Sequence, residues 1–208
     1  MKKIYLVLFA LAVLSSCKKD NSETGCLSQS TAIPTVSASD NATVLGLLQK
    51  NNIPTNNQVF SVYTSYEATN PGQPDILYQF VTTTQVKNGL PLFFEDIIYT
   101  FMNGTTYAIN GTQYVGFDLD ASPTKNLSEL KQLFINEAVT KQGLNASYKD
   151  TCLVAQFGYI DANLNSSNTT PNFVKAWEVK PEHSLYPQVY VRDDNGATVY
   201  FDSGIRLL

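Results

Sequence analysis

Two stretches of the chain combine apolar and β-branched residues on both sides of an Asn-Gly pair. The first runs from Leu92 to Ile109 and turns at Asn103-Gly104, and the second runs from Val189 to Phe201 and turns at Asn195-Gly196. Asn-Gly between two such runs is the strongest short-range signal of a β-hairpin, because a type I′ turn requires positive φ at both central residues. The pattern therefore predicts two hairpins and indicates that the same structural unit occurs twice.

Apolar residues at helical spacing occur twice, each time ahead of strand-like runs. The first group predicts a short helix that starts after an N-cap at Ser39 or Asp40 and ends near Lys50. The second helix is expected to follow an N-cap at Asn126 and to stop at Gly143. Further strands are expected over the runs rich in β-branched and aromatic residues, which are 59–66, 76–86, 152–160 and 173–179.

Each half of the chain thus contains one helix and about four antiparallel strands. Neither a helix nor a sheet with one apolar face is stable alone, so each helix should lie across its own sheet. The predicted fold class is α+β, with two tandem units, each one helix packed on an antiparallel sheet of about four strands. The predicted boundaries are residues 40–118 for the first unit and 119–208 for the second.

The first residues resemble a bacterial lipoprotein signal peptide. Lys2 and Lys3 precede a short apolar run, and small residues precede Cys17. The run is shorter than the roughly 20 residues that a membrane-spanning helix needs, so a signal peptide cleaved after residue 16 is expected. The resemblance implies lipid on Cys17 and a lipid-anchored protein of the cell envelope, and the lysines that follow suit the outer membrane. An ordinary secretory signal with an incidental cysteine is the alternative.

Residues 17–39 are polar and lack an apolar period, which predicts a flexible tether. Without the signal peptide the chain has 192 residues, with 12 basic and 18 acidic side chains and a net charge of −6. This balance, without a basic cluster, argues against nucleic acid as a partner and against binding to anionic lipid by charge. We expect a monomer that contacts the membrane through its N-terminal lipid.

Cys26 and Cys152 are the two cysteines that remain besides Cys17. In an oxidising compartment such a pair can form a lasting disulfide. The bridge would tie the N-terminal tether to the second unit. Two unpaired thiols, with Cys152 buried at the start of a strand, are the alternative.

Both units resemble domains found in the propeptides of thermolysin-like metalloproteases. The first is similar to the fungalysin/thermolysin propeptide motif through Leu77-Tyr78-Gln79-Phe80, Gln85, Asn88-Gly89-Leu90-Pro91-Leu92, the strand from Asp96 to Phe101, Asn103-Gly104 and Ile109-Asn110-Gly111. The second is similar to a PepSY domain through Ala176-Trp177-Glu178-Val179, Pro187, Val189-Tyr190-Val191, Asp193-Asp194-Asn195-Gly196 and Val199-Tyr200. The resemblance covers most of residues 40–204. It implies cystatin-like or PepSY-like units and binding to peptidases, either to inhibit them or to assist their folding.

The chain departs from that family because the propeptides precede a zinc protease, whereas this sequence ends at Leu208. It contains one histidine, His183, so a His-Glu-x-x-His zinc site cannot form. We expect no enzyme, no cofactor and no metal. His183 is interpreted as a surface turn residue, and Glu95 and Asp96 as solvated charges on opposite faces of a strand.

Two further groups of residues allow a functional and a structural interpretation. Asp193-Asp194-Asn195-Gly196 faintly suggests a calcium loop, but lacks the spacing of an EF-hand, and a hairpin turn explains it better. Trp177 and Tyr186 could form an aromatic platform for a sugar, although packing in the core is the more usual role of aromatic residues on strands.

These patterns predict a non-catalytic, lipid-anchored binding protein that is propeptide-like. It would bind or inhibit an exported peptidase through the open edges or the concave face of its sheets. The alternative is a surface lipoprotein that binds a glycan or another small ligand in a cleft between the units. The polar loop 161–172, Trp177 and Tyr186 would serve that second function.

Overall fold

The computed structural model describes residues 26–205 except residues 32, 34–36, 70, 73, 115, 144–147, 149 and 168–169. The expected signal peptide over 1–16 and the expected lipidation site Cys17 lie outside the described residues. The elements follow one another as β1 (Leu27–Ser30), α1 (Ala38–Lys50), β2 (Gln58–Ala68), β3 (Ile76–Lys87), β4 (Leu90–Pro91), β5 (Ile97–Met102), β6 (Thr105–Asn110), α2 (Leu127–Gln142), β7 (Leu153–Asp161), β8 (Phe173–Pro181), β9 (Gln188–Arg192) and β10 (Thr198–Asp202).

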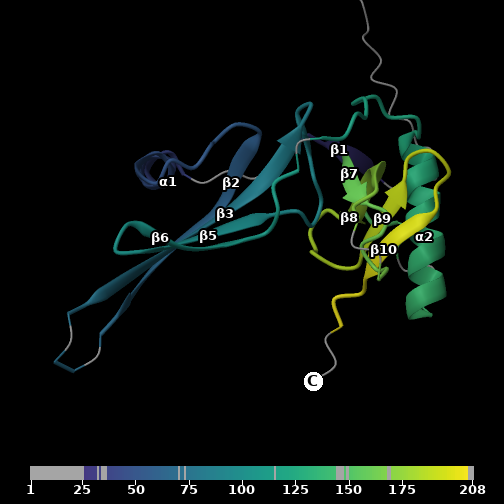
Figure 1. The fold of residues 1–208 in the computed structure, drawn as a ribbon. Coiled ribbons are helices and arrows are strands. Elements are labelled where there is room, and N and C mark those ends of the chain that lie inside the picture. The colour runs from purple at the N-terminus through teal and green to yellow at the C-terminus, as the bar shows by residue number, and fades with distance from the viewer. Residues whose placement is uncertain are drawn as a thin grey trace, which may run out of the picture.

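Two five-stranded sheets dominate the structure (Figure 1). Sheet A has the order β1-β7-β8-β9-β10, and sheet B has the order β2-β3-β5-β6 with β4 paired to β3. Of the described residues, 42% lie in strands and 17% in helices. The expected α+β class, with two tandem units of one helix on about four antiparallel strands, is therefore wrong. The protein is mostly β.

Strand β1 is one source of this difference, because it forms within the segment that was expected to be a flexible tether. It pairs in parallel with β7, with Leu27 opposite Leu153, and so joins segments that lie far apart in the sequence. Leu27 also packs against the core of sheet A. A four-residue strand with two serines has too little pattern to be recognised, and its pairing partner is set by the tertiary structure.

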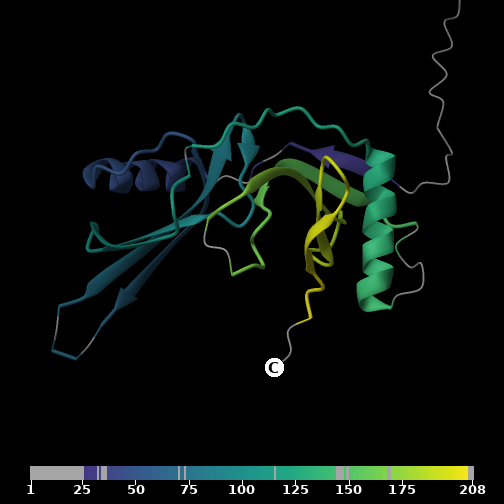
Figure 2. The ribbon, with the colours of Figure 1, turned by 45° about the vertical axis from the view of Figure 1, so that its right-hand side comes forward.

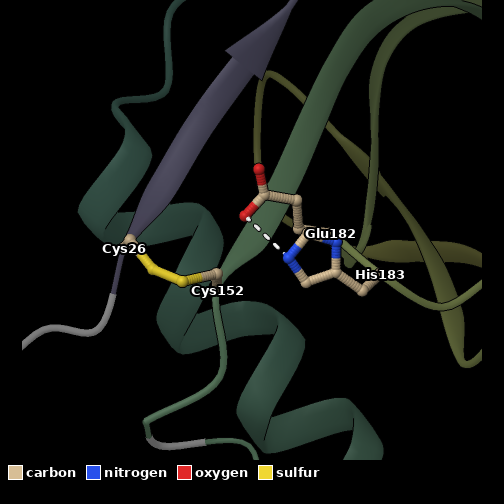
Figure 3. Close-up of a disulfide and its surroundings, with 4 residues drawn as sticks. All are labelled: Cys26, Cys152, Glu182 and His183. Atoms are coloured by element: carbon tan, nitrogen blue, oxygen red, sulfur yellow. Dashed lines mark ion pairs between the residues drawn. A yellow bond between two sulfur atoms is a disulfide. The ribbon is translucent and has the colours of Figure 1, made fainter.

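A disulfide between Cys26 and Cys152 holds the starts of β1 and β7 together (Figure 3). Their Cα atoms are 4.5 Å apart, although 126 positions separate them in the sequence. The Leu153 N–H also donates a hydrogen bond to the Cys26 carbonyl at 2.8 Å. The predicted disulfide is confirmed, and it secures a parallel strand rather than a tether.

The helix ends follow local rules closely. The Asn126 side chain accepts a hydrogen bond from the Glu129 N–H, and the Glu129 carboxylate accepts one from the Asn126 N–H, which forms a capping box. Gly143 ends α2 with φ 63°, as predicted. Helix α1 is capped by Ser37, slightly ahead of the expected Ser39 or Asp40. None of the helices that the structure describes has both the length and the apolar character needed to cross a membrane.

Each helix covers part of one face of one sheet, and the two helices lie on sides that face away from each other (Figure 2). The core beneath α1 comprises Val44, Leu47, Leu48, Phe60, Val81, Ile97, Tyr99 and Phe101. The core beneath α2 comprises Leu130, Phe134, Ala138, Leu153, Ala155, Phe157, Trp177, Val179, Val189 and Val191. The opposite faces are called below the open face of sheet B and the inner face of sheet A.

The two Asn-Gly pairs that predicted hairpins differ in conformation. Asn103 and Gly104 have φ 51° and 74°, so the turn between β5 and β6 has the predicted form. At the second pair only Gly196 has positive φ, at 73°, and the Gly196 N–H bonds to the Arg192 carbonyl at 3.0 Å. The second hairpin therefore has a longer loop, and the two halves do not repeat one another in detail.

The sheets meet where residues 91–94, which run from the end of β4 into the loop before β5, cross β7. Leu92 forms a parallel bridge with Tyr159, and the Phe93 N–H donates to the Tyr159 carbonyl at 2.8 Å. A Cβ atom added at Gly158 would lie 2.7 Å from both the Phe93 ring and the Pro91 carbonyl oxygen. Glycine at 158 is therefore what lets the two backbones approach this closely.

Phe94 continues this junction in an uncommon conformation for a large side chain, with φ 65°. Its ring contacts those of Tyr190, at 4.7 Å between centroids, and Tyr200, at 5.1 Å. Phe93 contacts Tyr190 as well, at 5.3 Å. These aromatic contacts on the inner face of sheet A offset the cost of the left-handed backbone, about 1–3 kcal/mol.

Replacing Gly158 by alanine should destabilise the protein by about 1–3 kcal/mol, because the methyl group would push Phe93 away from β7. Gly46→Ala is the matched control, since Gly46 lies in α1 with no atom near its added Cβ. That change should stabilise the protein by about 0.5–1 kcal/mol. Urea denaturation measures both free energies of unfolding. Equal changes in the free energy of unfolding for the two variants would contradict the close approach at Gly158.

Removing the disulfide with Cys26→Ser and Cys152→Ser together should lower the free energy of unfolding by about 2–4 kcal/mol, because the unfolded chain gains freedom. Wild-type protein treated with a thiol reductant should unfold at the same urea concentration as this double variant. If the unreduced wild type and the double variant unfolded at the same urea concentration, the disulfide would contribute nothing to stability.

Candidate functional site

Of the two interpretations of Trp177 and Tyr186, the structure favours core packing over an aromatic platform for Trp177, which belongs to the core of sheet A. Its side chain is only 1% exposed and packs against Phe157 with ring centroids 4.8 Å apart. Tyr186, by contrast, is partly exposed, and its ring lies against Gly204. Trp177 cannot reach a ligand at the surface, so the structure does not support a sugar site at these two residues.

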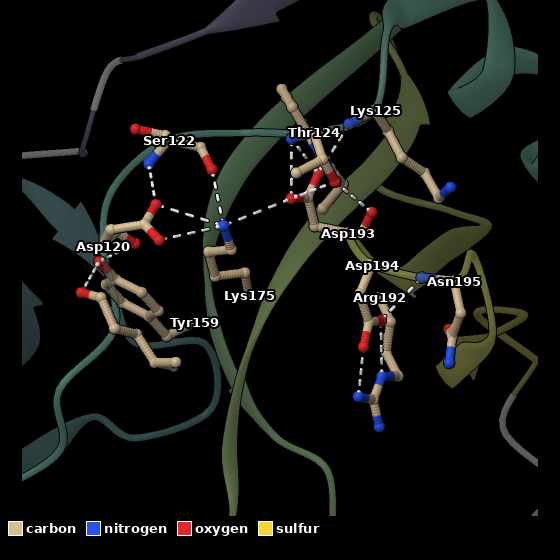
Figure 4. Close-up of polar contacts among 12 residues, drawn as sticks. Asp120, Ser122, Thr124, Lys125, Tyr159, Lys175, Arg192, Asp193, Asp194 and Asn195 are labelled. Atoms are coloured by element: carbon tan, nitrogen blue, oxygen red, sulfur yellow. Dashed lines mark hydrogen bonds and ion pairs between the residues drawn. The ribbon is translucent and has the colours of Figure 1, made fainter.

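Trp177 instead helps to hold a buried carboxylate, that of Asp193, whose contacts with Thr124 and Lys125 are drawn in Figure 4. Asp193 is fully buried and accepts a hydrogen bond from Trp177 Nε1 at 2.9 Å. The backbone N–H groups of Thr124 and Lys125 and the Thr124 hydroxyl also donate to its carboxylate, at 2.8–3.0 Å. The carboxylate thereby attaches the segment before α2 to the end of β9.

The ionisation of Asp193 follows from these contacts. Burial is the largest single influence and opposes the charged form. The donors from Lys125, Trp177 and Thr124 together outweigh it and hold the pKa of Asp193 below its usual value. Asp193 is thus a charged structural group at neutral pH.

The calcium interpretation of residues 193–196 is not supported. The Asp193 carboxylate is engaged by hydrogen-bond donors of Thr124, Lys125 and Trp177, and Asp194 pairs with Arg192 at 2.6 Å. Across the described parts of the chain, no group of three or more His, Cys, Asp or Glu residues is placed to hold a metal ion. The turn interpretation agrees with the structure, although the loop is longer than expected.

Two other sequence predictions concern isolated charges. The side chain of His183 is 90% exposed, with Glu182 3.9 Å away (Figure 3), so its interpretation as a surface turn residue is confirmed. Glu95 and Asp96 lie just before β5 rather than within a strand. Burial, then the charge of Asp161, raises the pKa of Glu95, while burial raises that of Asp96 against a hydrogen bond from Thr84.

Several exposed apolar side chains lie together on the open face of sheet B. Side chains at paired positions of neighbouring strands lie on this one face. Tyr66 is paired with Tyr78, and Thr82 is paired with Val62 on one side and Ile98 on the other. Tyr78 also contacts Tyr107, with ring centroids 6.1 Å apart. We call this surface the aromatic patch, and it consists of Val62, Tyr66, Tyr78, Phe80, Ile98 and Tyr107.

Most of the side chains of the aromatic patch are exposed to solvent. Tyr66 and Tyr107 are 62% and 63% exposed, and Val62 and Ile98 are exposed as well. Contiguous apolar patches on soluble proteins commonly mark sites of interaction with other proteins or ligands. Tyrosine suits such a site, since its ring contributes apolar area and its hydroxyl remains compatible with water.

Strand β2 borders this patch as a long edge strand. Its eleven residues pair only with β3, so alternate backbone N–H and C=O groups point away from the sheet. It carries a single charged residue, Glu67, and no proline. Edge strands usually avoid unwanted pairing through charges, prolines or short length, so β2 is suited to accept another strand.

The edges at β6 and β10 are less open, because side chains bond to them. Asn51 accepts a hydrogen bond from the Thr106 N–H at 2.8 Å and donates to the Gly104 carbonyl at 3.1 Å. Asn165 donates to the Val199 carbonyl in β10 at 3.3 Å. Within the described residues, the backbone of β2 has no comparable side-chain bond to its outer edge.

The chain matches no protein-family model and no curated protein. The resemblance to propeptide and PepSY domains therefore stays a prediction.

The sequence indicated neither the aromatic patch nor the buried role of Asp193. The run of β-branched and aromatic residues at 76–86 predicted a strand, but the sequence did not show which face of that strand a helix would cover. Asp193 could have been suspected from its place directly after an apolar strand. The donors that hold it come from a segment about seventy residues earlier, which no local pattern connects to it.

Asp193→Asn should lower the free energy of unfolding by about 2–4 kcal/mol at neutral pH, because the amide places N–H groups against buried donors. Since the folded state depresses the pKa of Asp193, its stabilisation is present above the unfolded pKa of about 3.9 and is lost as the pH falls through the folded value. The difference between variant and wild type should therefore shrink below about pH 4.

Asp194→Asn is the control for this change, because Asp194 is the next residue and forms an exposed ion pair with Arg192. It should cost less than about 1 kcal/mol. Urea denaturation between pH 3 and pH 7 measures both variants. An Asp193→Asn protein as stable as the Asp194→Asn protein would contradict the structural role of the buried carboxylate.

Proposed function

We propose that this protein is a non-catalytic, propeptide-like binding protein of the cell envelope, anchored by lipid on Cys17 after removal of residues 1–16. Its partner is an exported peptidase, which it binds or inhibits. The binding surface is the aromatic patch together with the outer edge of β2. The observation that carries the proposal is this pairing of exposed aromatic side chains with an unprotected edge strand.

The two features supply different parts of the binding energy. A partner segment in extended conformation can add a strand to β2, and its main-chain hydrogen bonds then contribute affinity that is largely independent of sequence. Side chains on one side of that segment would lie over Val62 and Tyr66 at the border of the patch. Burying the tyrosine rings contributes apolar area and selects for apolar or aromatic side chains in the partner.

The class of partner follows from the resemblance to metalloprotease propeptides. A peptidase recognises extended polypeptide. A propeptide-like protein would therefore contact the peptidase at or near the groove that binds the peptidase's substrates. The net negative charge of the chain gives no reason to expect nucleic acid. The glycan alternative has lost its expected aromatic support, because Trp177 is buried.

The proposal predicts that immobilised protein covering residues 18–208 captures a peptidase from the exported proteins of its own cell and lowers that peptidase's activity. Tyr66→Ser combined with Tyr107→Ser should weaken capture at least tenfold, because two exposed rings of the contact surface are lost. Binding is measured by biolayer interferometry and inhibition by peptide hydrolysis.

Leu185→Ser is the matched control, since Leu185 is 67% exposed but lies outside the aromatic patch. It should leave capture unchanged, and circular dichroism should show the same fold for all variants. Failure to recover any peptidase, or equal capture by the Tyr66/Tyr107 variant, would refute the proposed function. A thermal shift with glycans that depends on Tyr66 and Tyr107 would favour a glycan instead.

A further inference from the structure

A cavity of 170 Å³ lies where the open face of sheet B meets the inner face of sheet A. Residues 91–94 form an apolar wall that includes the rings of Phe93 and Phe94. Sheet B and the residues before β5 contribute Thr84 and Asp96, while sheet A contributes Gln156 and Glu178. The cavity therefore combines an apolar wall with polar groups from both sheets.

Both charged residues that line the cavity are acidic. Glu178 is 6% exposed, and its Oε1 accepts hydrogen bonds from the Tyr190 hydroxyl at 2.9 Å and from Lys180 Nζ at 3.1 Å. Asp96 has a neutral partner, the Thr84 hydroxyl, at 3.0 Å. No ion pair to Asp96 occurs among the residues that the structure describes. The Asp96 carboxylate therefore lines the cavity with no cationic side chain of the described residues paired to it, and its charge favours the binding of a cation there.

The shape of this site suits a particular kind of cation. Lysine and arginine carry their charge at the end of an alkyl stem, which favours apolar surroundings, while the charged head favours a carboxylate. The rings of Phe93 and Phe94 can contact such a stem, and aromatic faces also attract cations. An apolar wall offers no ligand to a hydrated metal ion, so the cavity favours an organic cation.

The cavity is continuous with the surface proposed to bind the partner. Asp96 lies two positions before Ile98, and Thr84 two positions after Thr82, so these side chains fall on the same face of sheet B. The aromatic patch and the cavity thus follow one another along that face, from the β2–β3 hairpin toward the junction of the sheets.

We propose that this cavity receives a lysine or arginine side chain of the bound protein, with Asp96 as the charge partner and residues 91–94 against the alkyl stem. This inference rests on the proposed function, which supplies the polypeptide. The chemistry recognised is an alkylammonium or guanidinium group, and the cavity selects partners that present one next to an apolar segment.

Nuclear magnetic resonance titration of residues 18–208 with N-acetyl-lysine amide tests the cavity directly. Saturable shifts should appear at the backbone amides of Leu92, Phe93 and Phe94 and at the side-chain amide of Gln156, with about millimolar affinity for a single exposed pair. N-acetyl-norleucine amide, which has the stem without the charge, should cause no saturable shift. Equal shifts with both compounds, or none with lysine, would overturn the proposal.

Asp96→Asn should weaken the binding of N-acetyl-lysine amide at least about tenfold, because it removes the charged acceptor. Glu182→Gln is the control, since Glu182 is an exposed acid that lies outside both the cavity and the proposed binding surface. It should not change the affinity. Unchanged affinity in Asp96→Asn would overturn the assignment of Asp96.

The source of the cation is tested with the captured peptidase. Weaker capture by Asp96→Asn than by Glu182→Gln supports a side chain of the bound protein, and undiminished capture overturns that source even if N-acetyl-lysine amide binds. Capture that depends on Tyr66 and Tyr107 but not on Asp96 would leave the proposed function intact and refute this inference alone. Binding of N-acetyl-lysine amide without any captured peptidase would refute the proposed function and leave only the affinity of the cavity for an alkylammonium group.

Discussion

The contact on which the structure depends is the close approach of two backbones at Gly158. Sheet A and sheet B have separate helices and separate cores, and they are joined where Leu92 and Phe93 pair with Tyr159. A hydrogen bond in a short parallel bridge would contribute little alone, about 1 kcal/mol. Here it is combined with the burial of Phe93 against Ile160, Ala176 and Tyr190, so the bridge also brings an apolar contact between the sheets. The absence of a side chain at Gly158 is what makes both possible.

The segment that connects the two sheets reinforces this junction. Phe117 stacks on Phe173 and contacts the edge of Tyr159, while the Tyr159 hydroxyl donates to the Asp120 carbonyl at 3.1 Å. Farther on, Asp193 holds Thr124 and Lys125, and Lys175 donates to the Ser122 carbonyl at 2.8 Å (Figure 4). The connection therefore lies along sheet A and is attached to it at several points, instead of forming a free linker.

This arrangement explains why the surfaces proposed for binding lie on one side. The helices cover the faces that point away from each other, and the junction joins the remaining faces at an angle (Figure 2). The inner face of sheet A near the junction is filled by Phe93 and Phe94, whereas the open face of sheet B retains exposed Tyr66 and Tyr107. The long edge of β2 borders that exposed face. Apolar side chains, unpaired backbone groups and an acidic cavity thus occur close together, and the proposed binding of an extended polypeptide would use all three.

The sequence by itself determined the local features of this protein. Asn126, Glu129 and Gly143 specify the ends of α2, and Asn103-Gly104 specifies a turn, because caps and tight turns depend on neighbours a few residues away. Alternation also located most of the long strands. Apart from the disulfide, tertiary structure decided what joins distant segments: the parallel pairing of β1, the five-stranded sheets, the burial of Asp193, and the face of sheet B that stays uncovered. The physical reason is that a side chain's burial and a strand's partner depend on what packs against them, and those groups lie tens of residues away or more.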